Sequence, residues 1–199
     1  GYRPYFKEAF GDEKITLTRI FEAIATYERT IVSGKSKFDR FISGDKNLFT
    51  DEEVLGLHLF RTKARCINCH FSPLFSDQQF HNLGLSYYGR KHEDLGRYKI
   101  TKDAADVGRF KTASLREVAR TAPYMHNGLI PSLDEVIQMY DAGMARPKPR
   151  KDQENDPLFP TTDPLLQKLS LTKEERAALK AFLLTLNSPA KREKMPELP

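Results

Sequence analysis

The chain has 199 residues, of which 39% are hydrophobic, enough for one well-buried domain or two small ones, and this composition excludes collagen-like, coiled-coil and low-complexity proteins. The formal net charge is +5, but Lys and Arg alternate with Asp and Glu along most of the sequence, so we expect a solvated mixed surface and no nucleic-acid binding. No apolar run approaches the roughly 18 residues of a membrane span, and the first residues lack the layout of a signal peptide.

Two amphipathic helices are predicted in the first third of the chain. The first covers about residues 16–31, because its apolar residues recur at helical spacing: Leu17, Ile20, Phe21, Ile24 and Ile31. The second begins after Thr50, where Glu53 completes a capping box, and its apolar residues continue to Phe60. This second helix leads directly into the cysteines of the chain.

The chain has two cysteines, and they occur in the segment Cys66-Ile67-Asn68-Cys69-His70. This spacing is the attachment signature of c-type haem. The two thiols add to the two vinyl groups of one porphyrin, and the histidine that follows places an imidazole under the iron. We therefore predict that Cys66, Cys69 and His70 bind one covalent haem c, which indicates redox chemistry or electron transfer.

Three other uses of the cysteines are weaker. A disulfide between Cys66 and Cys69 would close so short a loop that it would stabilise little. A thioredoxin-like pair needs a preceding strand, whereas helix is predicted before Cys66. A zinc site needs a second pair of ligands. The remaining histidines offer no paired spacing: His58, His81, His92 and His126.

The rest of the chain combines irregular segments with two short helices. Residues 72–112 contain no convincing strand alternation, and residues 146–164 form a Pro-rich charged loop. Capping boxes predict a helix near 133–142, stopped by Gly143, and a last helix from Thr172 to just before Ser188. Because a haem supplies apolar surface for loops to pack on, we expect a mainly α, class I cytochrome c-like helical domain around one covalent haem, with long irregular loops.

Several sequence blocks, together with the haem motif, follow one another in a specific order. They are Phe10-Gly11-Asp12, Tyr27-Glu28-Arg29-Thr30, Ser36-Lys37-Phe38-Asp39-Arg40, Phe80-His81-Asn82-Leu83-Gly84, Phe110-Lys111-Thr112-Ala113-Ser114-Leu115-Arg116 and Thr121-Ala122-Pro123-Tyr124-Met125-His126-Asn127-Gly128. In these blocks and their order, the chain resembles the C-terminal part of bacterial di-haem cytochrome c peroxidases and the related MauG-type enzymes. The resemblance covers most of the 199 residues.

The resemblance implies an oxidoreductase of two domains with one haem c each, in which the C-terminal haem passes electrons to a peroxide-binding N-terminal haem. This sequence has one haem motif and lacks tryptophan, including the family's inter-haem tryptophan. We therefore expect residues 1–45 to be a helical segment from the junction with a missing N-terminal haem domain. Residues 46–190 would be the cytochrome c-like haem domain and residues 191–199 a tail, with the catalytic residues upstream of this chain.

The function implied is that of the C-terminal electron-transfer domain of a periplasmic di-haem cytochrome c peroxidase that reduces hydrogen peroxide. Two alternatives stay open: a MauG-like di-haem oxidase of a protein or organic substrate, and a stand-alone mono-haem electron carrier. The partners implied are the N-terminal haem domain, a small redox donor such as a cytochrome c or cupredoxin, and hydrogen peroxide, with a homodimer as a further option. The periplasm is expected because c-type haem is attached outside the bacterial cytoplasmic membrane.

The sixth iron ligand distinguishes the peroxidase from the MauG-like oxidase, because a methionine raises the reduction potential of a haem and a phenolate lowers it. The resemblance places Tyr140 at the ligand position, as in MauG-type enzymes. A small shift of the alignment would substitute Met144, and a core tyrosine with a bonded hydroxyl is the remaining interpretation of Tyr140. We favour Tyr140.

The resemblance assigns further roles. The carbonyls of Thr121 and Pro123 match positions that help to bind calcium between the domains, and backbone oxygens suit that cation. Arg116 and His126 are expected near the haem edge, where an arginine can pair with a propionate, although a structural hydrogen bond explains His126 equally well. His81 is expected to be a loop histidine.

Overall fold

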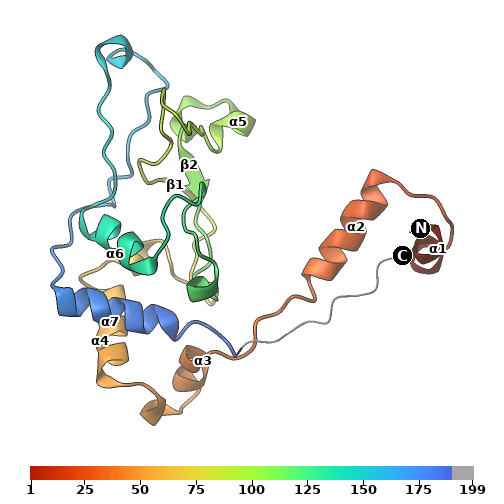
Figure 1. The fold of residues 1–199 in the computed structure, drawn as a ribbon, viewed down its shortest axis with the longest axis horizontal. Coiled ribbons are helices and arrows are strands. Elements are labelled where there is room, and N and C mark those ends of the chain that lie inside the picture. Colours follow the sequence, from red (N-terminus) through yellow and green to blue (C-terminus); the bar gives the residue numbers. More distant parts are fainter. Residues whose placement is uncertain (190–199) are drawn as a thin grey trace. The chain divides into compact units, whose positions relative to one another are not determined.

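The computed structural model describes residues 1–189, which divide into two compact units (Figure 1). The first unit contains Gly1–Gly34 together with Pro189, and the second contains Lys35–Ser188. The chain thus divides after Gly34, eleven residues before the end of the helical segment expected from the sequence at residue 45. The expected tail at 191–199 lies outside the described residues.

The first unit consists of the helices α1, Arg3–Phe10, and α2, Leu17–Glu28. The side chain of Thr16 accepts a hydrogen bond from the Arg19 backbone N–H and so caps α2, which confirms the predicted helix with an end at Glu28. Neither helix has a buried residue. The apolar residues of α2 are exposed, with Leu17, Phe21 and Ile24 at 69%, 63% and 51%.

The core of the second unit lies between α4, Asp51–Arg61, and α7, Lys173–Leu184, which pack side by side (Figure 1). Both helices begin with the predicted capping boxes. They approach closely because Gly56 of α4 has no side chain, and a Cβ there would lie 1.9 Å from the carbonyl oxygen of Ala178. Phe60 and Phe182 are almost completely buried at this contact.

Two further helices pack around this pair. The helix α6, Leu133–Asp141, confirms the predicted helix near 133–142, is capped by Ser132, and contacts α7. The helix α3, Lys37–Ile42, begins with a capping box of Ser36 and Asp39 that the sequence analysis did not use. The shorter helical turns are α5, Tyr98–Thr101, and the 3₁₀ turns Lys46–Leu48, Cys66–Asn68, Ala104–Asp106, Val118–Arg120 and Lys151–Gln153.

The region from 72 to 112 contains a small sheet that the sequence analysis missed. The strands β1, Phe80–Asn82, and β2, Arg109–Lys111, pair antiparallel with His81 opposite Phe110. Each strand has three residues, too few for an alternating pattern to be recognised in the sequence. The unit is therefore mainly helical with little sheet, as expected.

No helix among residues 1–189 is both long enough and apolar enough to cross a membrane.

Candidate haem-binding site

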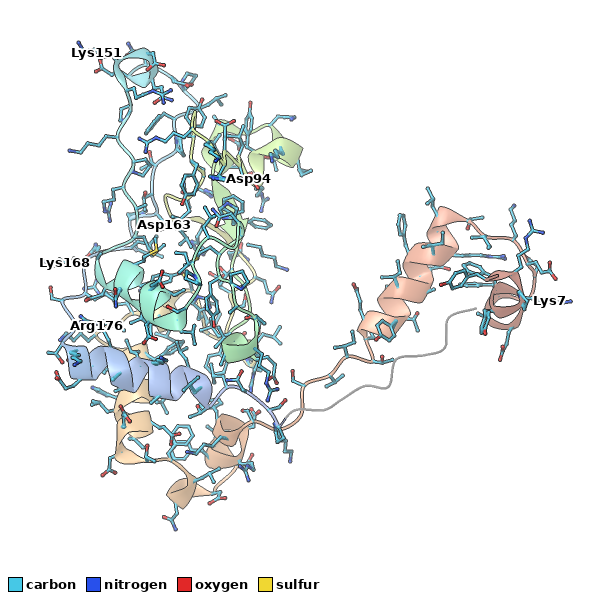
Figure 2. The ribbon with its side chains drawn as sticks, in the orientation of Figure 1. Lys7, Asp94, Lys151, Asp163, Lys168 and Arg176 are labelled. Carbon is cyan, nitrogen blue, oxygen red and sulfur yellow. The ribbon has the colours of Figure 1, made fainter. Side chains whose placement is uncertain are left out.

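The second unit encloses a cavity of about 470 Å³, within the range of cofactor pockets. Its walls come from the end of α4, the haem motif, β2, the segment 121–126, α6, the segment 163–171 and α7. Asp163 belongs to this lining, and Lys168 and then Arg176, in α7, follow it along the chain (Figure 2). Most of the lining is apolar, and its chemically active side chains are Cys66, Cys69, His70, His81, His126 and Tyr140.

The haem motif folds into a tight turn that presents all three of its functional side chains to the cavity. The backbone N–H of His70 donates to the Cys66 carbonyl oxygen at 2.9 Å, which closes the turn. Both cysteines are free thiols, so the structure contains no Cys66–Cys69 disulfide. Burial raises the pKa of Cys66 to about 12 and that of Cys69 to about 11, with Asp77 and Asp163 adding to the effect at Cys69. Thiols held protonated in this way are poor redox nucleophiles, which argues against a thioredoxin-like pair.

His70 is held in the state that an iron ligand requires. Its Nδ1 lies 2.9 Å from the Phe75 carbonyl oxygen, an acceptor, so Nδ1 carries the proton of the neutral ring and Nε2 is the unprotonated nitrogen. Burial is the largest influence on the His70 imidazole and lowers its pKa, which favours the neutral ring. The residues present therefore fit a covalently attached haem: two thiols, one oriented imidazole and an apolar cavity.

Tyr140 and Met144 lie differently with respect to this cavity. Tyr140, in the last turn of α6, lines it together with His70, and burial, with smaller contributions from Cys66 and Cys69, raises the pKa of its phenol well above the ordinary value. Met144 is buried beyond Gly143 and is not part of the cavity lining. The geometry thus brings Tyr140, and not Met144, into one cavity with the haem motif.

Arg116 lies outside the cavity lining. Its Nη1 donates to the Asp39 carboxylate at 2.8 and 2.9 Å, and its Nε donates to the Pro73 carbonyl oxygen at 2.9 Å. These contacts tie α3 to the loop that follows the haem motif. The pairing of Arg116 with a haem propionate stays a prediction, and the structure gives its guanidinium other partners.

The remaining predicted residues line the cavity. The ring of His126 stacks on Phe110 at 3.6 Å with an interplanar angle of 11°, and burial lowers its pKa. Thr121 and Pro123 also belong to the lining. Calcium binding by their carbonyls stays a prediction.

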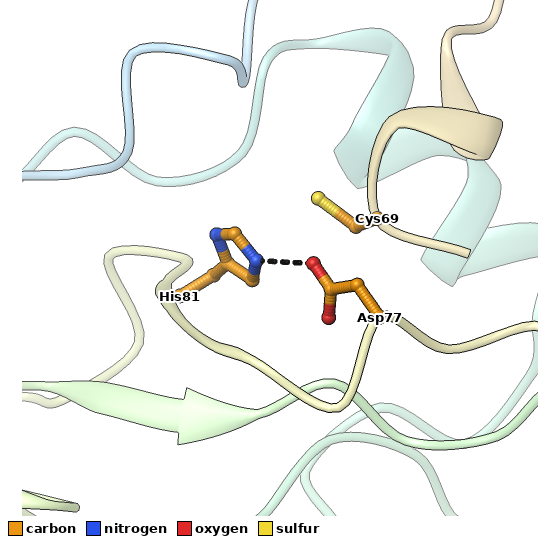
Figure 3. Close-up of side chains that lie close together, drawn as sticks. All are labelled: Cys69, Asp77 and His81. Atoms are coloured by element: carbon orange, nitrogen blue, oxygen red, sulfur yellow. Dashed lines mark hydrogen bonds and ion pairs between the residues drawn. The ribbon is translucent and has the colours of Figure 1, made fainter. Parts of the chain in front are cut away.

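The sequence analysis missed two features of the cavity. Arg65 and Lys111 are cations of its lining, and Arg65 donates to Gln167 at 3.0 Å. His81, expected to be an ordinary loop histidine, also lines the cavity. It is hydrogen-bonded to the carboxylate of Asp77 (Figure 3) and to that of Asp163. No local sequence signal connects His81 to Asp163, because they lie 82 residues apart.

Comparison with known proteins identifies relatives over nearly the whole chain. The family model for di-haem cytochrome c peroxidases matches residues 1–47. The chain is 36% identical to cytochrome-c peroxidase IdrP1 of Pseudomonas sp. (strain SCT), over 94% of this chain and 54% of the relative. It is 35% identical to methylamine utilization protein MauG of Methylophilus methylotrophus, over 100% of this chain and 56% of the relative.

A solved structure, that of a MauG-like protein associated with microbial copper homeostasis, is similar in fold and sequence. It superposes with a TM-score of 0.73 at 32% identity, over 92% of this chain and 61% of that protein. The chain therefore spans about half the length of the curated relatives it matches.

Proposed function

Because the chain belongs to the di-haem cytochrome c peroxidase and MauG family, we propose that it is the C-terminal electron-transfer haem domain of a periplasmic enzyme that reduces hydrogen peroxide. The observation that carries the proposal is the meeting of Cys66, Cys69 and His70 in one largely apolar cavity. Such a cavity would suit a covalently held redox cofactor that relays electrons.

The residues of this chain have separate roles in the proposed relay. A bound haem c supplies a one-electron couple. Cys66 and Cys69 would hold it through thioether bonds, and His70 would offer Nε2 to the iron, while the Phe75 carbonyl fixes the ring through Nδ1. Apolar side chains from α6 and α7, including Leu133, Ile137 and Leu179, keep water from the cavity.

The peroxide chemistry belongs, in this proposal, to a second haem domain absent from this chain. The reduction of one hydrogen peroxide to two waters consumes two electrons and two protons, so two one-electron centres suit it. Within the first unit, Leu17, Phe21 and Ile24 of α2 are left uncovered, and apolar surface of this kind is normally covered by another element. A small donor such as a cytochrome c or cupredoxin, a homodimer, a second haem and calcium stay predictions of the same proposal.

A MauG-like oxidase of a protein or organic substrate is the second candidate. The position of Tyr140 in the cavity, with Met144 outside its lining, favours this branch. A phenolate ligand lowers the haem potential and stabilises oxidised iron, which suits an enzyme that withdraws electrons from a substrate.

The test is a pyridine haemochrome assay with ferric and ferrous spectra of the protein, produced together with the haem-attachment machinery. We expect covalent haem in the native chain and none in the Cys66→Ala/Cys69→Ala variant. Absence of covalent haem from the native chain would refute the proposed function. A Met-to-iron charge-transfer band would exclude Tyr140 as the ligand and favour an ordinary peroxidase relay.

The ligand is identified with two matched variants. Tyr140→Phe removes one hydroxyl, and we expect it to abolish the tyrosinate-like features of the ferric spectrum. Met144→Leu replaces a buried side chain of similar size outside the cavity lining, and we expect an unchanged spectrum. The reverse pattern would contradict the assignment of Tyr140.

A further inference from the structure

Three side chains from separate parts of the second unit meet at the wall of the cavity. His81, on β1, has its Nε2 2.8 Å from Asp77 Oδ2 and its Nδ1 2.7 Å from Asp163 Oδ2. Asp77 belongs to the loop after the haem motif, and its backbone N–H donates to the Cys69 carbonyl oxygen at 2.8 Å. We call Asp77, His81 and Asp163 the carboxylate–imidazole cluster.

The geometry of the cluster defines its charge. Each ring nitrogen of His81 faces a carboxylate oxygen, which accepts hydrogen bonds, so both nitrogens must donate and the ring is an imidazolium. Burial alone would lower the pKa of His81, but the hydrogen bonds with Asp163 and Asp77 outweigh burial and raise it. Two carboxylates and one imidazolium leave the cluster with one net negative charge.

The cluster lies beside the thiol that anchors the cofactor. Ligand atoms of Cys69, Asp77 and His81 all lie within 4.8 Å of one another, and Figure 3 shows Cys69 Sγ next to the bonded Asp77–His81 pair. His81 and Asp163 are also part of the cavity lining. Charges fixed at a largely apolar wall act strongly on a cofactor that gains an electron inside it, because the medium screens them less than water does.

We propose that Asp77, His81 and Asp163 are positioning residues that set the reduction potential of the haem anchored at Cys69. The inference rests on the haem binding proposed above. The carboxylates oppose the arrival of an electron and the imidazolium favours it, so the potential follows the balance of the three charges. The same hydrogen bonds hold the loop at 77 and the segment at 163 against β1, which fixes the distances of these charges from the cofactor.

The test is potentiometric titration of the holoprotein at pH 5.5, above the ordinary pKa of a carboxyl and below that of an imidazole, so that His81 stays charged when one carboxylate is removed. Asp163→Asn and Asp77→Asn each remove a negative charge, and we expect the ferrous-to-ferric ratio at fixed applied potential to rise about threefold to tenfold. For a one-electron couple, tenfold corresponds to about 59 mV. His81→Gln removes the positive charge, and we expect a fall of similar size.

The control is Asp156→Asn, which makes the same change of charge at an aspartate that accepts a hydrogen bond from Tyr88 and does not line the cavity. We expect it to leave the potential unchanged. Opposite shifts in the Asp and His variants distinguish an electrostatic role from loosening of the fold, which would move all three variants in one direction.

The haemochrome assay on every sample separates this inference from the proposed function. Covalent haem with potentials that do not move, or that move in the same direction in all three variants, would overturn the role of the cluster and leave haem binding intact. A native protein without covalent haem would remove the proposed function itself. If His81→Gln does not fold, the near-isosteric Asp163→Asn variant still decides, because the proposal requires its potential to rise.

Discussion

The contact between α4 and α7 provides a sharp test of the packing, through the substitution Gly56→Ala. A Cβ at this position would lie 1.9 Å from the carbonyl oxygen of Ala178, 2.7 Å from its carbonyl carbon and 2.8 Å from the Cβ of Phe182. These are mainly backbone atoms, so no side-chain rotation relieves the overlap and the two helices must separate.

The magnitude follows from two opposing effects. Replacing glycine by alanine in a helix interior stabilises the helix by about 1 kcal/mol, whereas adding a methyl group to a packed core costs roughly 1 to 3 kcal/mol and sometimes more. The overlap at Gly56 exceeds what a flexible neighbour could absorb, so we expect the substitution to lower the free energy of unfolding by about 2 kcal/mol. For a chain of this size, that loss corresponds to a thermal unfolding midpoint about 4 to 8 °C lower.

The assay is equilibrium urea unfolding of the haem-loaded protein, followed by far-UV circular dichroism and by haem absorbance. Leu55→Ala, at the neighbouring half-exposed position of the same helix, is the control and is expected to cost less than Gly56→Ala. A Gly56→Ala variant that is as stable as the native protein, or more stable, would show that the two helices do not approach as described.

Two further predictions concern the second unit. Phe182→Ala removes a side chain with 0% exposure from the α4–α7 core, and we expect it to lower the free energy of unfolding by about 3 to 5 kcal/mol in urea titration; a loss below 1 kcal/mol would contradict its placement. Burial works against the charged form of Asp39, but hydrogen bonds with Ser36 and the ion pair with Arg116 lower its pKa. A carboxyl whose pKa is lower in the folded than in the unfolded state stabilises the fold at a pH above its unfolded pKa. That stabilisation is lost as the pH falls through its folded pKa. Asp39→Asn should therefore lower the free energy of unfolding by about 1 kcal/mol at pH 7 and by progressively less below about pH 4. Thermal unfolding of both proteins between pH 2 and pH 7 measures this difference, and a gap that widens on acidification would refute the assignment.

The parts of the fold that were predictable from the sequence are the local ones. Thr50 with Glu53 and Thr172 with Glu175 start α4 and α7 where the capping boxes predict, because a cap involves residues three apart. The haem motif is equally local. The same kind of signal at Ser36 and Asp39 would also have identified α3.

The parts that were not predictable depend on residues distant in the sequence. Arg116 meets Asp39 across 77 residues and His81 meets Asp163 across 82, so neither pairing leaves a pattern along the chain. The amphipathic pattern of α2 predicts a buried face, yet Leu17 and Phe21 are exposed within the first unit. Periodicity shows which face of a helix can be covered, but it does not identify the element that covers it.

The partial burial of Cys66 links haem attachment to folding. In the folded unit this thiol is partly buried in the cavity wall, and burial raises its pKa to about 12, so very little reactive thiolate exists at neutral pH. The opposite walls of the cavity come from α6 and α7, which follow the motif by more than sixty residues. We therefore expect thioether formation to be faster before these helices close over the motif than afterwards.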